Sequence, residues 1–315
     1  MKPVINFLTV NDFSKEQLLK MLKLADLVKK SPERYQNALR NKKMALIFQK
    51  TSTRTRLSFE VGMLELGGHP IYIDWRTTNF ILGALEDEMR CVGRYVDIIM
   101  ARVYSHKDLI KMISATETPI INGLSDLYHP CQALADFQTM FENLGRRTDF
   151  KLTFVGDGNN NVTHSLMLMS AKLGNECWVA CPKEYQPAPE VMEIIQNLEF
   201  SDKIHVTSDL EAAMKDADVV YADTFVSMGK EEESRKRLEK FKPYQLNADL
   251  VSTTGKETLI MHCLPAHRDI EITSEVLDSE QSIVFDQAEN RLHSQKALLI
   301  TLMKENIKDR DIFDY

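Results

Sequence analysis

The sequence is poor in cysteine and has no long apolar run, and each shortage excludes a class of protein. Its five cysteines are odd in number and scattered, and only Cys177 and Cys181 lie close together. No second pair follows at zinc-ligand spacing, so we expect reduced thiols in a reducing compartment. No apolar run approaches the roughly 20 residues that cross a bilayer, and the N-terminus lacks the apolar core of a secretion signal. We therefore expect a cytoplasmic protein that does not contact membranes.

An excess of positive charge is also missing. The formal net charge is −7, from 39 Lys and Arg against 46 Asp and Glu, which excludes a general surface for nucleic acid or anionic lipid. A local arginine cluster can still oppose this global sign and bind a small anion. The 315 residues, 43% apolar and 27% charged, have an ordinary globular composition but are too many for one core. Their number favours two domains.

Strand-like and helix-like segments alternate along the whole chain, which predicts an α/β fold with parallel sheets and crossover helices. A polar break at 145–149 separates two expected domains, each a parallel sheet flanked by helices. The first is 1–147 and the second 148–287, with a C-terminal helix at 288–315 packing back on the first. The expected strands are 43–48, 69–74, 97–101 and 118–121, then 151–155, 176–180, 204–207, 218–222, 258–262 and 282–285. The expected helices are 14–30, 56–66, 85–95, 106–114 and 130–144, then 162–173, 188–198, 209–215, 231–240 and 287–306.

The segment 48–56 has the composition of an anion-binding loop. An apolar run ends at Phe48, a helical pattern begins near Leu57, and Ser52-Thr53-Arg54-Thr55-Arg56 lies between them. The first turn of a helix presents unpaired N–H groups and partial positive charge, and arginine adds a planar fork for phosphate or carboxylate. The alternative is an N-capped helix with solvated arginines. Two arginines interleaved with three hydroxyls favour the anion site.

Polar residues recur after the expected strands, where ligands bind in open parallel sheets. They follow residues 48, 101, 121, 155, 222, 262 and 285, and two sheets facing a cleft would gather them into an active site. His129 and Gln132, at the start of the helix at 130–144, share a face. A neutral imidazole there could donate to a carbonyl oxygen and polarise it. A structural histidine is the alternative.

Two loops of the second half are candidates for binding a polar substrate. The run 156–161 lacks the third glycine of a dinucleotide fingerprint, because Asn161 stands in its place. It disfavours NAD and suits a substrate tail such as an α-carboxylate, although a Gly/Asn-rich turn is the alternative for Asn159. Asp223 could bind an ammonium group with Ser227 as a polar partner. By itself that segment is equally a loop with an N-cap serine.

Cationic and thiol groups appear near the C-terminal end. His262 and Cys263 are neighbours in an expected strand and point to opposite faces, so we expect no Cys/His nucleophile pair. Backbone carbonyls and the thiol there are better suited to bind an amine. Arg291, at the head of the final helix, could add a third cation to the anion site.

Together these motifs resemble those of the aspartate/ornithine carbamoyltransferases. The matching stretches are Ser-Thr-Arg-Thr-Arg at 52–56, His-Pro-Cys-Gln at 129–132 followed by Ala-Leu-Ala-Asp, and His-Cys-Leu-Pro at 262–265. Asp223 with Ser-Met-Gly at 227–229 is similar to the ornithine branch. The resemblance covers nearly the whole chain. It implies transfer of the carbamoyl group of carbamoyl phosphate to the δ-amine of ornithine, giving citrulline and phosphate, by a homotrimer with sites at subunit interfaces.

The resemblance also implies site residues, with no metal, no other cofactor and no nucleic-acid partner. Arg54, Arg102, His129 and Cys263 would be catalytic. Carbamoyl phosphate would be bound by Ser52, Thr53, Arg54, Thr55, Arg102, His129, Gln132, Cys263, Leu264 and Arg291. Ornithine would be bound by Asn161, Asp223, Ser227 and Met228.

One loop departs from the family pattern. Relatives usually carry a Gln or His, then a Gly and a Glu-Ser pair, before the helix at 85–95, whereas Thr78 and Gly83-Ala84 stand roughly in these places here. The loop at 77–84 is also more apolar. Two alternatives therefore accompany ornithine carbamoylation. One is a carbamoyltransferase acting on putrescine, an N-acylornithine or lysine. The other is a non-catalytic ligand-binding relative, against which the retained arginines and His129 argue.

Overall fold

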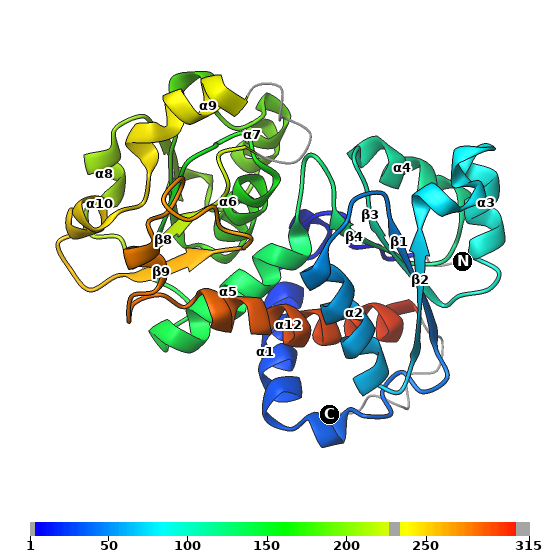
Figure 1. Ribbon diagram of the computed structural model, residues 1–315. Helices are drawn as coiled ribbons and strands as arrows, with labels where there is room; N and C mark the ends of the chain where they lie inside the picture. The colour runs from blue at the N-terminus through cyan, green and yellow to red at the C-terminus, as the bar shows by residue number, and fades with distance from the viewer. Residues whose placement is uncertain (1–3, 227–233, 307–315) are drawn as a thin grey trace. The chain divides into compact units, whose positions relative to one another are not determined.

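The computed structural model describes residues 4–226 and 234–306 and divides into two compact units, Met1–Gln138 with Glu289–Tyr315, and Thr139–Ala288. Each unit contains one parallel sheet with helices in the connections (Figure 1). The alternation of strand and helix patterns therefore predicted the fold class correctly.

The sheet of the first unit has the strand order β2-β1-β3-β4, with every pair parallel. Its strands are β1 (Lys43–Phe48), β2 (His69–Asp74), β3 (Ile98–Arg102) and β4 (Ile120–Leu124). Apolar residues of β1, β3 and the crossover helices form its core, since both faces of a central parallel strand are covered. The helices are α1 (Lys15–Lys30), α2 (Thr53–Glu65), α3 (Leu85–Val92), α4 (His106–Ala115) and α5 (Pro130–Leu144), whose last residues belong to the second unit.

The sheet of the second unit has the strand order β7-β6-β5-β8-β9, again all parallel. Its strands are β5 (Lys151–Val155), β6 (Glu176–Ala180), β7 (Ile204–Thr207), β8 (Val219–Ala222) and β9 (Leu259–His262). The reversal of strand order between β5 and β8 is a topological switch point, where α/β sheets bind ligands. Its helices are α6 (Asn161–Leu173), α7 (Pro189–Gln196), α8 (Leu210–Met214), α9 (Ser234–Phe241), α10 (Ala248–Ser252) and α11 (Ser274–Leu277).

The expected strand at 282–285 is wrong. Ser282 makes only an isolated bridge to Ile260, and the helix α12 (Val284–Asn306) begins two residues later. Val284 is buried in the core of the second unit, whereas Phe285 is 69% exposed. A short apolar run has no periodicity that separates a strand from the first turn of a helix, which explains the error.

From Glu289 onward α12 belongs to the first unit and packs on it, as expected. Lys296 Nζ donates to Glu65 of α2 at 2.5 Å, and Lys29 of α1 donates to Asn290 at 2.9 Å. Gly62 permits the close approach of α2, because a Cβ there would lie 3.2 Å from Lys296 Cγ.

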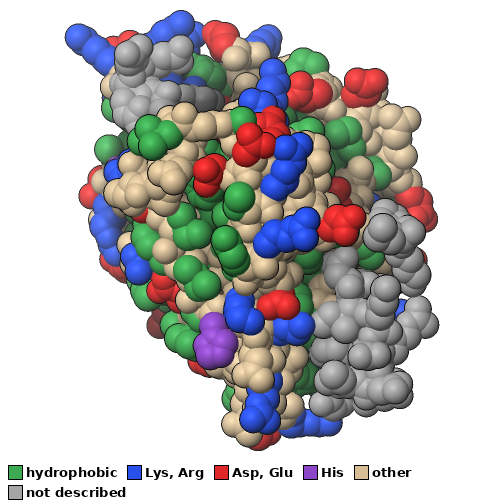
Figure 2. Space-filling model, turned by 90° about the vertical axis from the view of Figure 1, so that its right-hand side faces the viewer, with side chains coloured by type: hydrophobic (Ala, Val, Ile, Leu, Met, Phe, Trp, Pro, Cys, Tyr) green, Lys and Arg blue, Asp and Glu red, His purple; other side chains and the backbone are tan. Residues whose placement is uncertain are grey.

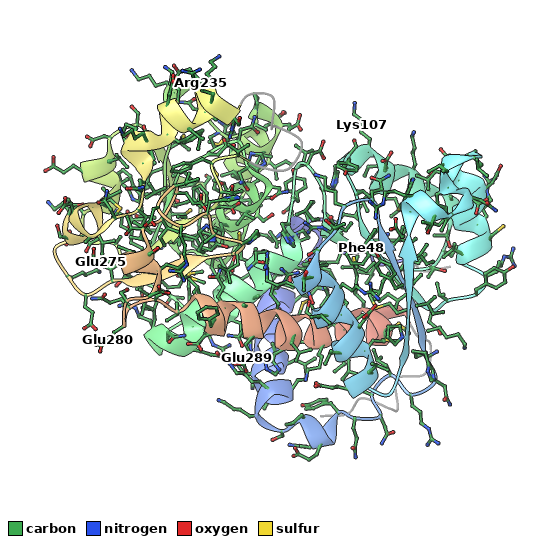
Figure 3. The ribbon with its side chains drawn as sticks, viewed as in Figure 1. Phe48, Lys107, Arg235, Glu275, Glu280 and Glu289 are labelled. Carbon is green, nitrogen blue, oxygen red and sulfur yellow. The ribbon has the colours of Figure 1, made fainter. Side chains whose placement is uncertain are left out.

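The surface carries charges of both signs. In the face shown in Figure 2, Lys and Arg side chains are interspersed with Asp and Glu. Figure 3 shows Lys107 on α4 and Arg235 on α9 extending outward, while Phe48 lies at the end of β1, directly before the candidate anion loop. Among the described residues, no helix has both the length and the apolar composition of a membrane span.

Candidate active site

The anion loop lies at the N-terminus of α2, which begins at Thr53, three residues earlier than expected. Ser52 is the N-cap, and its hydroxyl accepts a hydrogen bond from the Thr55 N–H at 3.2 Å. Thr53, Arg54 and Thr55 therefore form the first turn, where the helix dipole favours an anion. Sheet order brings in Arg102, because β1 pairs with β3 and Phe48 is in register with Arg102.

The buried side chain of His129 lies near three arginines, of which Arg102 and Arg291 are buried and Arg54 is half-buried. The imidazole lies just before α5, and the pKa of His129 falls well below its usual 6.5. Burial is the main cause, followed by the positive charges of Arg291, Arg102 and Arg54. The ring is therefore neutral at physiological pH and can act as a hydrogen-bond donor but not as an acid.

Arg291 hydrogen-bonds to side chains of two motifs that lie far from it in sequence, the anion loop and the start of α5. Its Nη1 donates to Gln132 Oε1 at 2.6 Å, and its Nη2 donates to Thr55 Oγ1 at 3.3 Å. Gln132 Nε2 in turn donates to Asp136 Oδ1 at 2.8 Å. All four side chains are buried, so the first unit presents one hydrogen-bonded network of cation, hydroxyl and amide.

The turn before His129 is fixed by polar side chains. Asn122 at β4 donates to the backbone oxygens of Leu8 and Tyr128 at 2.9 and 3.3 Å. Ser125 N donates to Tyr128 O at 3.0 Å, and His106 Nδ1 lies 3.0 Å from Ser125 Oγ. These contacts set the direction in which the chain enters α5, and so the placement of His129.

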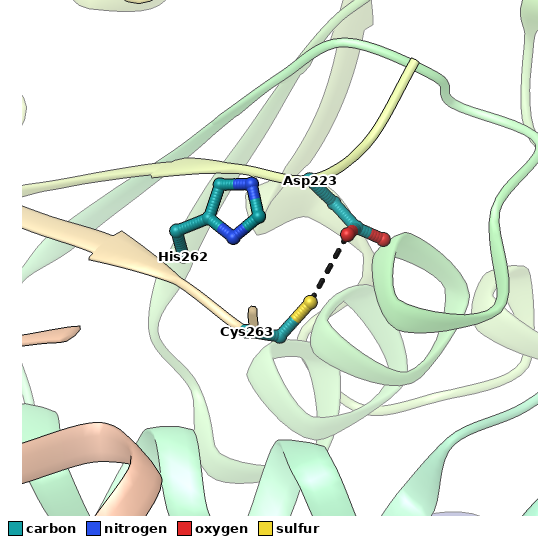
Figure 4. A group of neighbouring side chains, drawn as sticks. All are labelled: Asp223, His262 and Cys263. Carbon is teal, nitrogen blue, oxygen red and sulfur yellow. Dashed lines mark hydrogen bonds between the residues drawn. The ribbon is translucent and has the colours of Figure 1, made fainter. Parts of the chain in front are cut away.

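In the second unit, Asp223 directly follows β8, and its carboxylate accepts three hydrogen bonds. Figure 4 shows the one from Cys263. The donors are Thr224 N at 2.8 Å, Asn160 Nδ2 at 2.8 Å and Cys263 Sγ at 3.1 Å. Asn160 is the N-cap of α6, and its Oδ1 accepts from Val162 N at 2.7 Å. These contacts hold the Asp223 carboxylate, a group that suits an ammonium ligand, at the end of β8.

His262 supports the adjacent turn. Its Nδ1 accepts from Leu264 N at 2.9 Å, and its Nε2 lies 3.2 Å from Glu271 Oε1. The tautomer is therefore the one with hydrogen on Nε2. Leu264 has a φ of 55°, a left-handed conformation that is uncommon for leucine and that this bond helps to hold.

A single trio among the described residues has the composition of a metal site. The ligand atoms of Asp223, His262 and Cys263 lie within 4.8 Å of one another. Both ring nitrogens of His262 already contact Leu264 and Glu271, and Cys263 donates to Asp223. A cation would have to displace these hydrogen bonds, so the geometry favours the protein contacts.

Gly158, in the 156–161 loop, serves close packing. A Cβ on Gly158 would lie 2.5 Å from the backbone oxygen of Tyr185 and 2.8 Å from Cys181 Sγ, so only glycine fits. Asp157, in the same loop, forms a buried ion pair with Arg237 of α9.

The structure thus groups the expected residues by unit. Those of the anion site in the first unit are Ser52, Thr53, Arg54, Thr55, Arg102, His129, Gln132 and Arg291. Cys263, Leu264, Asn161 and Asp223 belong to the second unit. Ser227 and Met228 lie outside the described residues. Sequence reasoning missed Asn160 as the partner of Asp223, although its N-cap position was a usable signal.

Comparison with known proteins agrees with these features. A family model described as the aspartate/ornithine carbamoyltransferase carbamoyl-P binding domain matches residues 6–142, and the model of the Asp/Orn binding domain matches residues 148–302. An ornithine carbamoyltransferase of Methanothermobacter thermautotrophicus is 48% identical over 293 residues, 91% of this chain and 96% of that protein. One of Thermococcus kodakarensis is 46% identical over 304 residues, 94% of this chain and 95% of that protein.

Solved structures give the same result. The ornithine carbamoyltransferase of Pyrococcus furiosus superimposes with a TM-score of 0.89 at 45% identity, covering 93% of this chain and 95% of that one. Identity of this extent over both units, with the motif residues placed as described, leaves no other family in question. The chain belongs to the ornithine carbamoyltransferases within the aspartate/ornithine carbamoyltransferase family.

Proposed function

We propose that this protein transfers the carbamoyl group of carbamoyl phosphate to the δ-amine of L-ornithine, giving L-citrulline and phosphate. The observation that carries the proposal is the arginine cluster around a buried, neutral His129, with Thr55 and Gln132 hydrogen-bonded to Arg291 of that cluster. Such a cluster fits a small phosphorylated substrate with a carbonyl group. It supplies cations for the phosphate and a neutral donor for the carbonyl oxygen.

Residues of the first unit act in the chemical step by preorganised electrostatics. The δ-nitrogen lone pair forms a bond to the carbamoyl carbon, and negative charge builds on the carbonyl oxygen. The C–O bond to phosphate then breaks, phosphate departs, and the nitrogen loses a proton. Arg54, Arg102, His129 and Thr55 stabilise the developing charge, with Ser52, Thr53 and Arg291 completing the phosphate site.

Residues of the second unit hold the amino acid. Asp223, held in place by its three donors, binds the α-ammonium group, and Asn161 with its neighbour Asn160 binds the α-carboxylate. Ser227 and Met228 are assigned to ornithine by the motif alone. The thiol of Cys263 and the backbone at Leu264 serve the attacking amine and the carbamoyl group.

A panel of amine acceptors tests the substrate. The protein is mixed with carbamoyl phosphate and with ornithine, putrescine, N-acetylornithine or lysine, and ureido product is measured. We expect ornithine to give the highest kcat/KM. Turnover of another amine without turnover of ornithine would overturn the substrate but keep the reaction. Calorimetric binding of carbamoyl phosphate without turnover of any amine would instead indicate a non-catalytic relative.

We also propose a homotrimer, or a multiple of it. The outer face of α2 exposes Leu57 by 53% and Leu64 by 59%, and the neighbouring loop exposes Ile81 by 61% and Leu82 by 79%. Apolar groups this exposed on one unit are typical of a face covered by another subunit. Light scattering should give three times the 36.2 kDa chain mass, or a multiple of that. The double substitution Leu57→Lys with Leu64→Lys should reduce the mass of the particle in solution. A monomeric wild-type protein would overturn the proposal.

The relatives and the cysteines support proposals on metabolic direction and cellular location. A relative from Pyrococcus furiosus, 44% identical, is named an anabolic ornithine carbamoyltransferase, and we propose the same direction here, toward arginine. We further propose a cytoplasmic location, which is supported by five cysteines that are all free thiols. Restoration of growth without arginine, in a host that lacks the enzyme, tests the first proposal, and cell fractionation tests the second.

A further inference from the structure

Asp136 ends the buried hydrogen-bond chain of Thr55, Arg291 and Gln132, and it is the one member to which the proposed chemistry gives no role. It lies one helical turn after Gln132 on α5, and its carboxylate is fully buried. Gln132 Nε2 donates to Asp136 Oδ1 at 2.8 Å, while Gln132 Oε1 accepts from Arg291 Nη1 at 2.6 Å. A buried carboxylate is costly unless it is hydrogen-bonded, so this contact calls for a function.

The contact decides which end of the Gln132 amide is the acceptor. A primary amide has a donor end and an acceptor end of nearly equal size, and a rotation of 180° exchanges them. Asp136 Oδ1 accepts a hydrogen bond from Gln132 Nε2, so Asp136 takes the NH₂ end. The guanidinium of Arg291 only donates, so it takes the oxygen. The two partners therefore favour one orientation and oppose the other.

That orientation matters for a carbamoyl substrate. The carbamoyl group also has a donor end, its NH₂, and an acceptor end, its carbonyl oxygen. Arg54, Arg102 and His129 supply donors to the oxygen, so the group still needs an acceptor for its NH₂. Gln132 Oε1, the end of the amide that does not contact Asp136, supplies that acceptor. A reversed amide would present a second donor to the NH₂ and repel it.

We propose that Asp136 is a positioning residue, which fixes the Gln132 amide with its oxygen toward the carbamoyl NH₂. It acts through Gln132 and does not touch the substrate. This inference rests on the proposed function, because it names how the carbamoyl group is recognised in the same site.

Three variants test the orientation. Asp136→Asn keeps the size of the side chain but removes one of the two partners that fix the Gln132 amide, because the new amide at position 136 can donate as well as accept. We expect kcat/KM for carbamoyl phosphate to fall by about 10- to 100-fold. The KM for ornithine should stay within about twofold. Gln132→Glu places two carboxylates against each other and should be still less active. The double variant Gln132→Glu with Asp136→Asn moves the negative charge to residue 132 and lets the new amide at position 136 donate to it.

The double variant gives the decisive readout. Because the new amide at position 136 can donate to the carboxylate at position 132 and so fix its orientation, kcat/KM of the double variant should exceed that of Gln132→Glu by about tenfold or more. A merely structural role for Asp136 predicts that the double variant regains thermal stability without that gain in kcat/KM. Asp218→Asn is the matched control. Its carboxylate accepts from Arg146 at 2.6 Å and from Lys256 at 2.8 Å in the second unit. It should lower thermal stability and leave kcat/KM unchanged.

The outcomes separate this inference from the proposed function. If the wild type makes no citrulline, the proposed function fails. If the wild type is active and Asp136→Asn matches it, or if the double variant is no better than Gln132→Glu, the positioning role is overturned. If Asp136→Asn folds poorly, the test uses the other two variants and measures their binding of carbamoyl phosphate by calorimetry. The double variant keeps the net charge of the wild type and should bind carbamoyl phosphate more tightly than Gln132→Glu does.

Discussion

The buried ion pair between Asp157 and Arg237 should be worth far more than a surface pair. Both side chains are almost inaccessible, at 0% and 2% exposure. Arg237 Nε also donates to the Phe225 backbone oxygen at 2.7 Å, and its guanidinium lies 4.6 Å from the Tyr185 ring centroid and 5.1 Å from that of Phe241. The pair therefore ties the loop after β5 to the segment after β8 and to α9.

The magnitude follows from the burial. Removing one partner of a buried pair leaves the other charge desolvated, which costs about 3–5 kcal/mol. Asp157→Asn and Arg237→Met should each lower the free energy of unfolding by about that amount. The double variant removes both charges, so its loss should fall below the sum of the single losses by about 2 kcal/mol or more. With a urea slope of about 2 kcal/mol/M, each single variant shifts the midpoint by about 1.5–2.5 M.

Fluorescence during urea unfolding can isolate the unit concerned. The chain has two tryptophans, Trp75 in the first unit and Trp178 in the second. In a Trp75→Phe background the signal reports the second unit alone, and each variant is compared with that background. Arg235→Met is the matched control, since the Arg235 side chain on the same helix is 95% exposed and its loss should cost less than about 1 kcal/mol. Additive losses in the double variant, or single losses near those of the control, would refute the reasoning.

The titratable and charged groups of the chain and of its proposed substrate support four further predictions. The rate should rise from about pH 6 to about pH 9, because ornithine's δ-amine has a lysine-like pKa of roughly 10 and only its neutral form attacks; a flat profile with chemistry limiting would count against this. Burial, then the nearby arginines, lowers the pKa of His129. Its contribution to stability is therefore full above about pH 6.5 and is lost on acidification by up to about 1.4 kcal/mol per pH unit. His129→Gln should flatten that part of the urea-midpoint profile. Arg291→Met should raise KM for carbamoyl phosphate by about 10- to 100-fold in steady-state assays, with KM for ornithine nearly unchanged, because it removes charge-assisted bonds to Gln132 and Thr55. Exposed Cys91 should react with a disulfide reagent within minutes, while Cys131, whose pKa burial raises to about 12, should react only on unfolding. Equal labelling rates in mass spectrometry would contradict that difference.

Local physics made much of the fold readable from the sequence. The capping box of Ser14 and Gln17 marks the start of α1, and the structure contains both of its hydrogen bonds. Apolar runs bounded by turns gave β1, β2, β5, β6 and β7 with the bounds the structure has. Hydroxyls interleaved with arginines at Ser52–Arg56 indicated an anion site, because side-chain chemistry and a helix N-terminus act over only a few residues.

Only tertiary structure decided which distant side chains meet. Arg291 reaches Gln132 and Thr55 across 159 and 236 residues of sequence, and no local pattern predicts those contacts. The tertiary structure also decided that Asn160, the N-cap of α6, contacts Asp223, and that Asp136 contacts the amide of Gln132. In the run at 282–285 the helix begins at Val284, because burial of Val284 in the core settled what a short apolar pattern left ambiguous. Periodicity and caps are set by neighbours in the chain, whereas orientation in a buried network is set by packing and by charges from far along it.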